Sequence, residues 1–279
     1  MSTDYQRARE ALGKRLHQLR GEAGLTGRQL AAALGWAHSK ISKLENGQQT
    51  ATAADLTAWA EATGQPGAAA SLVADLRGLE TNYQSWRRRL AKGHQPIQEA
   101  IRKAEQVVGH TRAYEPLTVP GLLQTPEYAR AVFAANAVLH QSPRDTDAAV
   151  MERMRRQEAL YQPGKRFEFI VSEAALRSLI CPREAMVAQV YRLAGAIGLP
   201  NVSLGIIPFA TQLTLGLRHS FWIQDDQYVT VETISAEQYL DSPTDVALYL
   251  RAWEMYQAVA VFGTEAHRLL SSVALLLAA

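Results

Sequence analysis

Cysteine is almost absent from this chain of 279 residues, in which Cys181 is the only one. A single thiol excludes a disulfide within the chain, so we predict a protein of the reducing cytoplasm. Because Cys181 stands alone beside Pro182, we interpret it as a small buried residue and not as a redox sensor.

Long apolar runs are absent too. The N-terminus has no apolar segment that could serve as a signal peptide. The longest apolar run, residues 273–279, is far shorter than the ~20 residues that a membrane-spanning helix needs. We therefore expect no association with a membrane.

Motifs for catalysis and metal binding are also missing. The seven histidines are scattered, with no pair at the spacing of helical metal ligands and no cysteine cluster beside them. There is neither a Gly-x4-Gly-Lys phosphate loop nor a Gly-x-Ser-x-Gly nucleophile elbow. We predict that the protein is not an enzyme and has no catalytic residues, no cofactor and no metal ligands.

The chain has little net charge, only +2, but that charge is unevenly distributed. Residues 1–110 contain 15 basic and 10 acidic side chains, a net +5, whereas residues 111–279 contain 14 and 17, a net −3. The length suffices for two domains. A basic N-terminal part beside an acidic remainder is typical of a protein that contacts DNA at one end.

Two short helices joined by a tight turn are predicted between residues 25 and 50. Thr26 is a candidate N-cap of the first helix, and Gly35 ends it because glycine readily adopts the left-handed conformation. The second helix is predicted from Ala37 to Glu45, where Asn46-Gly47 stops it.

The second of these helices has the pattern of a DNA-recognition helix. Its apolar positions are Ile41 and Leu44, so its polar and basic residues face outward. A small helix of this kind fits the DNA major groove, whereas the alternative is an ordinary pair of surface helices. The candidate DNA-binding residues are His38, Ser39, Lys40, Ser42, Lys43, Gln48, Gln49, Thr50 and Arg28.

The segment resembles the helix-turn-helix of the phage-repressor-like (XRE/Cro) regulators, in which a residue such as Ile41 and the exit Glu45-Asn46-Gly47 form a recurrent signature. The resemblance implies an all-α DNA-binding domain. The flanking segments agree with it, because 9–23 and 52–63 supply the expected first and fourth helices. Their apolar positions are Leu12, Leu16 and Leu19 in the first and Leu56, Trp59 and Ala60 in the fourth.

The chain departs from this family at two positions. Gly27 stands where the family often has a glutamine that contacts phosphate. Ala37 stands where the N-cap of the recognition helix is usually serine or threonine, which weakens the start of that helix by about 1 kcal/mol. We expect Ile41, Leu44, Leu30 and Trp59 to form the core of this domain.

Gly64-Gln65-Pro66-Gly67 is predicted to end the DNA-binding domain, 1–67. A connecting helix, 68–93, is expected next, with apolar residues at a 3.5-residue repeat: Leu72, Leu76, Leu79, Tyr83, Trp86 and Leu90. Its partner is either the same helix of a second subunit or the C-terminal domain, and we favour the latter. The basic run Arg87–Arg89 with Lys92 is interpreted as a solvated face, with a supplementary phosphate contact as the alternative.

Residues 94–279 are predicted to form an α+β domain with a small, mostly antiparallel sheet, so the whole chain is mainly α, with about five helices in the N-terminal part. The predicted strands are 113–119, 167–171, 202–208, 220–223 and 228–232, the last two joined by a hairpin turn at 224–227. Thr125-Pro126-Glu127 and Ser172-Glu173 each open a helix. Further helices are expected at 96–108, 146–161, 183–197, 243–261 and 264–277.

The segment Val119–Ala131 resembles the hallmark of a domain that follows such helix-turn-helices in actinobacterial regulators. Glu105, Arg153–Gln157, Glu173–Arg177 and Val202–Phe209 continue the resemblance. Members are described as Scr1-type, antitoxin-like transcriptional regulators, often encoded beside a small partner protein. The resemblance implies a regulator and a possible protein partner, and supplies no catalytic residues.

Five aromatic residues of the C-terminal domain are candidates for lining a small-molecule pocket. They are Tyr191, Trp222, Tyr228, Tyr239 and Trp253. Because a core of this size also uses aromatic residues, we favour core packing for each of them.

These observations predict a sequence-specific DNA-binding transcriptional regulator. We expect a homodimer on an inverted-repeat operator in double-stranded DNA, because one recognition helix reads few base pairs. The C-terminal domain is expected to receive a signal from a small protein encoded nearby or from a small-molecule ligand. The alternative is an antitoxin-like protein whose main role is to bind a small partner, with DNA binding for autoregulation.

Overall fold

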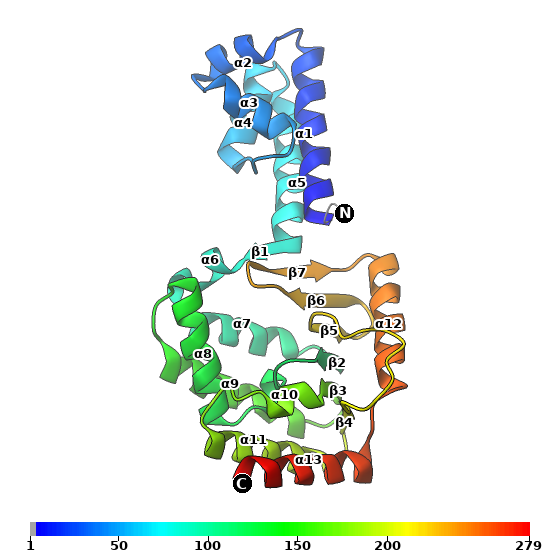
Figure 1. Cartoon of the computed structure of the whole chain (residues 1–279). Coiled ribbons are helices and arrows are strands. Elements are labelled where there is room, and N and C mark those ends of the chain that lie inside the picture. The colour runs from blue at the N-terminus through cyan, green and yellow to red at the C-terminus, as the bar shows by residue number, and fades with distance from the viewer. Residues whose placement is uncertain (1–3) are drawn as a thin grey trace. The chain divides into compact units, whose positions relative to one another are not determined.

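The computed structural model describes residues 4–279, except for the side chains of residues 4–8, 77–85, 87 and 88. The chain divides into two compact units, an N-terminal unit, Met1–Gln84, and a C-terminal unit, Ser85–Ala279. Figure 1 shows helices alone in most of the first unit and a sheet with helices in the second.

The N-terminal unit is all-α, as predicted. Its helices are α1 (Asp4–Glu22), α2 (Gly27–Leu34), α3 (His38–Glu45), α4 (Ala53–Ala62) and α5 (Ala69–Asn82), with the 3-10 turn η1 (Pro66–Ala68) before α5. Thr26 caps α2 in a capping box with Gln29, and Thr52 caps α4 in the same way with Asp55. Gly35 ends α2 in the left-handed conformation, with φ of 65°.

One apolar core holds these helices together. The predicted members Leu30, Ile41, Leu44 and Trp59 are each at most 2% exposed, so the predicted core is confirmed. The Trp59 indole N–H donates a hydrogen bond of 3.2 Å to the Leu16 carbonyl oxygen, which ties α4 to α1.

The prediction of one continuous connecting helix over residues 68–93 is wrong. After α5 the chain forms β1 (Tyr83–Ser85), α6 (Trp86–Arg89) and the 3-10 turn η2 (Leu90–Lys92). Leu72 and Leu76 belong to the core of the N-terminal unit. The physical reason is that Gly64, with φ of 70°, only turns the chain back, so that α5 packs against α1 and α4.

Part of the predicted heptad cannot be placed. Leu79 and Tyr83, with Arg87 and Arg88 of the basic run, lie outside the described side chains. Arg89 is described and pairs with Glu237 of the C-terminal unit.

The C-terminal unit is α+β, as predicted. Its helical elements are α7 (Gln95–Glu105), η3 (Gly121–Leu123), α8 (Pro126–His140), α9 (Thr146–Arg156), η4 (Gln157–Tyr161), α10 (Glu173–Arg177), α11 (Arg183–Ala196), α12 (Pro243–Gln257) and α13 (Gly263–Ala278). Its strands are β2 (His110–Glu115), β3 (Arg166–Ser172), β4 (Val202–Ile207), β5 (Phe221–Gln224), β6 (Tyr228–Glu232) and β7 (Ala236–Leu240).

These strands follow the order β7-β6-β5-β2-β3-β4 in a mixed sheet. The pairs β2–β3 and β3–β4 are parallel, whereas β2–β5, β5–β6 and β6–β7 are antiparallel. The predicted hairpin between β5 and β6 is confirmed. Its central residues Asp225 and Asp226 have φ of 50° and 56°, the left-handed conformations that a type I′ turn requires.

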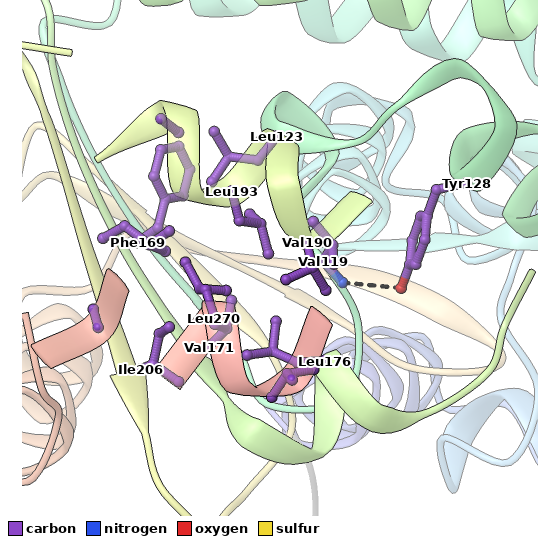
Figure 2. Packing of buried hydrophobic residues seen from close by; sticks show 14 of the residues in the cluster. Val119, Leu123, Tyr128, Phe169, Val171, Leu176, Val190, Leu193, Ile206 and Leu270 are labelled. Carbon is purple, nitrogen blue, oxygen red and sulfur yellow. Dashed lines mark hydrogen bonds between the residues drawn. The ribbon is translucent and has the colours of Figure 1, made fainter. Parts of the chain in front are cut away.

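Two apolar clusters lie on the two faces of this sheet. On one face, Phe169, Val171 and Ile206 of β3 and β4 pack with Val190 of α11 and Leu270 of α13 (Figure 2). On the other face, Tyr114, Phe221 and Val231 pack with Trp253 and Tyr256 of α12. The Tyr114 and Tyr256 rings stack with their centroids 4.0 Å apart.

The hallmark segment after β2 fastens the helices to the first of these clusters. The Val119 N–H donates to the Tyr128 hydroxyl at 3.1 Å, as Figure 2 shows. The Gln124 side chain donates to the Val119 carbonyl at 2.8 Å, and the buried Gln189 of α11 donates to the Leu123 carbonyl at 2.8 Å. These bonds satisfy the polar groups of a buried loop, so this part of the motif is structural.

Candidate functional site

The α2–turn–α3 segment presents the candidate recognition helix on a fixed support. Gly13 of α1 allows α3 to approach closely, because a Cβ atom there would lie 2.4 Å from the Glu45 carbonyl oxygen. Arg20 of α1 donates to Glu45 at the end of α3 through Nε, at 2.5 Å, and Nη2, at 2.9 Å. The position of α3 is thereby set by backbone contact and by a bidentate ion pair.

The Glu45 carboxylate is held in its ionised form by this pair. Burial raises the pKa of Glu45, but hydrogen bonds from Arg20 and His17 outweigh burial and leave the pKa below its usual value. Glu45 is therefore committed to the support and is not available to DNA.

The exposed side of α3 carries the polar residues that the sequence predicted. Ile41 and Leu44 are 1% and 2% exposed, whereas His38, Ser39 and Lys43 are exposed. Ser42 is half-buried, and its carbonyl and hydroxyl oxygens accept from the Asn46 side chain at 2.8 and 3.2 Å. His38, Ser39 and Lys43 thus form the accessible set on this helix.

Lys40 differs from its neighbours because its ammonium group already has partners. Lys40 Nζ donates to Asp55 Oδ1 at 2.7 Å and lies 3.8 Å from the centre of the Trp36 ring. Burial raises the pKa of Asp55, but hydrogen bonds from Lys40 and Thr52 outweigh it and lower that pKa below its usual value. We call this group, Trp36, Lys40 and Asp55, the α3–α4 clamp.

The start of α3 has no side-chain cap, as Ala37 predicted. Gly27, the second position at which the chain departs from the family pattern, lies close to His38. A Cβ atom on Gly27 would lie 3.2 Å from Nε2 of His38. Glycine therefore gives the His38 ring room at the junction of α2 and α3. Arg28, the next residue, is exposed.

The segment after α3 turns back along the helix. The backbone N–H groups of Gln48 and Gln49 both donate to the Lys43 carbonyl oxygen, at 2.8 and 3.2 Å. Their side chains are exposed, and Thr50 is half-buried. The structure therefore brings Lys43, Gln48 and Gln49 together at one end of α3, with His38 and Ser39 at the other.

The five candidate aromatic residues of the C-terminal unit do not gather in one pocket. Trp253 of α12 is buried in the core, and Tyr191 is exposed on α11. Trp222, Tyr228 and Tyr239 lie on the sheet, where the Tyr228 and Tyr239 rings stack at 4.7 Å. The preference for core packing is confirmed for the buried Trp253 and for the half-buried Trp222, which packs against the core on the other face of the sheet.

Trp222 lies next to charged residues that the sequence pattern did not indicate. Its indole N–H donates to Glu115 Oε1 at 2.8 Å. Burial, followed by the charge of Glu232, raises the pKa of Glu115 to about 7. Strand alternation in β2, β5 and β6 could have placed Glu115, Trp222 and Glu232 on one face, but the strand order was needed to bring them together.

Arg153 of α9 faces the same carboxylates. Burial, followed by repulsion from Arg156, lowers the pKa of Arg153 to about 9, and attraction to Glu232 and Glu115 opposes that shift. Its guanidinium donates to two neutral amide oxygens, Gln98 Oε1 at 3.2 Å and Gln124 Oε1 at 2.6 Å. Arg153 remains a cation at neutral pH.

Comparison with known families agrees with the two units. A model described as a helix-turn-helix domain matches residues 11–72, which supports a DNA-binding regulator. A model described as a domain of unknown function (DUF5753) matches residues 98–272. No curated protein matches the chain. Within the described part of the chain, no helix has the length and apolar character needed to cross a membrane. Because the second model covers more than half of the chain, the chain belongs to the DUF5753 family.

Proposed function

We propose that this member of the DUF5753 family is a sequence-specific transcriptional regulator whose C-terminal unit receives a signal. The observation that carries the DNA-reading part is the division of α3. Ile41 and Leu44 are buried, whereas His38, Ser39 and Lys43 are exposed on the same eight-residue helix. That division is what a helix needs in order to enter the major groove.

Each exposed residue has a role that its chemistry suggests. His38, Ser39 and Lys43 can hydrogen-bond base edges, and Gln48, Gln49 and Arg28 can reach flanking phosphates. Ser42, Thr50 and Lys40 stay in the proposed set, although Lys40 must leave the α3–α4 clamp to reach DNA.

We propose a homodimer on an inverted repeat with half-sites about 34 Å, or a multiple of it, apart. The predicted connecting helix could have paired with the same helix of a second subunit, but its Leu72 and Leu76 are buried within the N-terminal unit. We therefore favour the C-terminal helices, where Leu275 and Leu276 of α13 are 72% and 55% exposed. Light scattering of the Leu275→Glu, Leu276→Glu double variant tests this, and a wild-type mass for that variant would exclude this surface.

Selection of binding sites from a random DNA pool with the full-length protein tests the proposed function. The expected result is a palindromic consensus that binds wild type and is lost in a His38→Ala, Ser39→Ala, Lys43→Ala variant. A matched control is Lys103→Ala, because Lys103 is an exposed lysine that pairs with Glu99 in the C-terminal unit. Enrichment of no consensus, or an unaffected triple variant, would reject the DNA-reading helix.

The signal itself is proposed to be a small protein or a small molecule. An antitoxin-like role, in which partner binding is the main task, is the second candidate, and the resemblance of Val119–Ala131 to such regulators favours it. Operator titration with and without the purified product of a neighbouring small reading frame separates the two. Coupling of two sites typically changes affinity by 1–3 kcal/mol. Absence of both a complex and a shift would reject that protein as the signal.

A further inference from the structure

The first residue of α6, Trp86, is fastened to the turn between β6 and β7. Its backbone N–H donates to the Ser235 carbonyl oxygen at 3.1 Å, and its indole N–H donates to the Thr233 carbonyl oxygen at 2.9 Å. The Arg89 guanidinium, three residues later, lies 5.0 Å from the centre of the Trp86 ring and pairs with Glu237 of β7. We call this set of contacts the α6 latch.

The turn is a firm support for the latch because its own hydrogen bonds close it. The N–H and the hydroxyl of Thr233 both donate to the Ala236 carbonyl oxygen, at 2.8 and 2.9 Å. The Ala236 N–H donates back to the Thr233 hydroxyl at 3.2 Å. Ile234 between them is 77% exposed. The carbonyl groups that hold Trp86 therefore have fixed positions on the surface of the C-terminal unit.

The latch has little apolar support. The Trp86 ring is half-buried, and among the described side chains it belongs to none of the apolar clusters. Trp59 provides the contrast, because its indole N–H also donates to a carbonyl oxygen but its ring is 0% exposed in a core. Since apolar burial is the main stabilising contribution in folding, the α6 latch should open far more readily than the unit unfolds.

The latch lies directly after the connection to the DNA-binding unit. Helix α5 ends at Asn82, and residues 83–85 alone separate it from Trp86. The next anchors along the chain are Leu90, which is 3% exposed, and the backbone N–H of His94, which donates to Asp145 at 2.9 Å. Opening of the latch therefore adds residues 86–89 to the tether, which span at most about 14 Å when extended.

We propose that the α6 latch sets the reach of the DNA-binding unit: while Trp86 is docked the tether ends at residue 85, and after undocking it ends at residue 89. This inference rests on the proposed function, because reach matters for a dimer that reads two half-sites, but the latch can be measured without DNA. A signal that binds the turn only when Trp86 is undocked shifts the protein towards the long tether.

A longer tether weakens the binding of the second half-site. In a linked pair, the second site is bound at an effective concentration that falls with the −3/2 power of tether length or more steeply. Lengthening from three residues, 83–85, to seven, 83–89, lowers that concentration by at least about threefold. Opening of the latch should therefore weaken binding to the palindrome and leave binding to a single half-site unchanged.

Limited trypsin digestion of the full-length protein measures the latch. The basic run Arg87–Arg89 supplies cleavage sites directly after Trp86, and native-state proteolysis tracks the population of the open form. Trp86→Ala should speed cleavage at this run by at least about tenfold. Cleavage after Arg218, which is exposed between β4 and β5, is the internal reference and should keep its rate.

Milder variants separate undocking from unfolding. Trp86→Phe keeps a ring but lacks the indole N–H, and Glu237→Gln removes the ion pair of Arg89, so each should speed cleavage by less than Trp86→Ala does. Tyr191→Ala is the matched control, because Tyr191 is an exposed aromatic residue on α11. Hydrogen exchange in β2–β4 should stay at the wild-type rate, and if Trp86→Ala changes it, the two milder variants decide.

Two outcomes of the digestion would overturn the latch: cleavage of the basic run in wild type as fast as after Arg218, or a wild-type rate in all three variants. In operator titration, Trp86→Ala should bind the palindrome at least about threefold more weakly and a single half-site equally well. Faster cleavage with unchanged palindrome affinity, or an equal loss on both DNAs, would reject the role of the latch in reach. If selection enriches no palindrome, the proposed function fails while the digestion still decides whether the latch exists.

Discussion

The two units of this protein differ in how far apart in the sequence the residues of their main polar clusters lie. In the N-terminal unit, α3 and the following turn supply nearly all the candidate DNA contacts within residues 38–50. In the C-terminal unit, Glu115, Arg153 and Glu232 come from three elements and meet only through the strand order. A cluster on one helix is encoded locally, whereas a cluster on a sheet depends on the whole topology.

The largest expected effect tests the local core of the N-terminal unit. Ile41→Ala should destabilise this unit by about 2–5 kcal/mol, because Ile41 is 1% exposed and the shortened side chain leaves a cavity. Hydrogen exchange followed by mass spectrometry on the full chain should show faster exchange in α1–α5 and unchanged exchange in β2–β7.

Leu72→Ala sharpens the same comparison, because Leu72 is fully buried in this core. Its effect should be of similar size and should fall on the same helices. Faster exchange in the C-terminal unit after this change would instead indicate that α5 packs on that unit, as the sequence predicted for the connecting helix. Ile41→Val, at a cost of about 0.5–1.5 kcal/mol, is the conservative control.

The sequence predicted the N-terminal unit well because its signals are local. Thr26, Gly35 and the spacing of Leu12, Leu16 and Leu19 act within a few residues, and the structure confirms each of them. The wrong prediction concerned α5. The heptad spacing of Leu72 and Leu76 identified the apolar face of this helix correctly but did not identify what that face packs against. Periodicity defines a face, and only the tertiary fold decides what covers it.

The C-terminal unit shows the same limit more strongly. The sequence of β7, Ala236–Leu240, has no regular alternation of apolar and polar residues, so that strand was not predicted. The start of β2 was placed at Ala113, three residues after the observed His110. The hairpin at Asp225-Asp226 was predictable, because a turn of this type has its own residue preferences. The proximity of Arg153 to Glu232 was not predictable, because it depends on how α9 packs on the sheet.

A pH-dependent stability should distinguish the C-terminal unit from the N-terminal one. The pKa of Glu115 is raised to about 7 by burial and by Glu232. A carboxyl group with a raised pKa in the folded state favours folding while it is protonated, and that contribution is lost as pH rises from about 4.5 to about 7. Arg153, Trp222 and Thr118 are the other polar groups that act on it.

Glu115→Gln should therefore stabilise the protein at pH 8 relative to wild type, by up to about 3 kcal/mol, and leave stability at pH 4.5 nearly unchanged. Urea denaturation at the two pH values measures this difference. In the N-terminal unit the pKa of Glu45 is lowered, so Glu45→Gln should cost stability at pH 8 instead. The same sign for both variants would contradict the contrast.

The next effect tests whether the exposed end of α3 reads DNA. Lys43 is exposed, and Lys43→Ala should weaken operator binding by about 1–3 kcal/mol if the ammonium contacts a base, with relaxed preference at one base pair. If it contacts a phosphate, binding should weaken for all sequences, and the salt dependence of log K should fall by about one. Unchanged affinity and selectivity would remove Lys43 from the interface.

The smallest expected effect separates Lys40 from Lys43, although both are lysines on one helix. Lys40 is held by Asp55 at 2.7 Å and by the Trp36 ring, so its release for DNA would break the α3–α4 clamp. A half-buried ion pair of this kind is typically worth about 1 kcal/mol or less. Lys40→Met keeps the side-chain stem against Trp36, and we expect operator affinity to change less than in Lys43→Ala, with the salt dependence unaltered.

Asp55→Asn provides the complementary measurement, because it frees the Lys40 ammonium without removing it. If Lys40 only positions α3, the Asp55→Asn protein should show no gain in salt dependence. A steeper salt dependence in Asp55→Asn, lost again in the double variant with Lys40→Met, would instead make Lys40 a phosphate contact that the clamp holds in reserve.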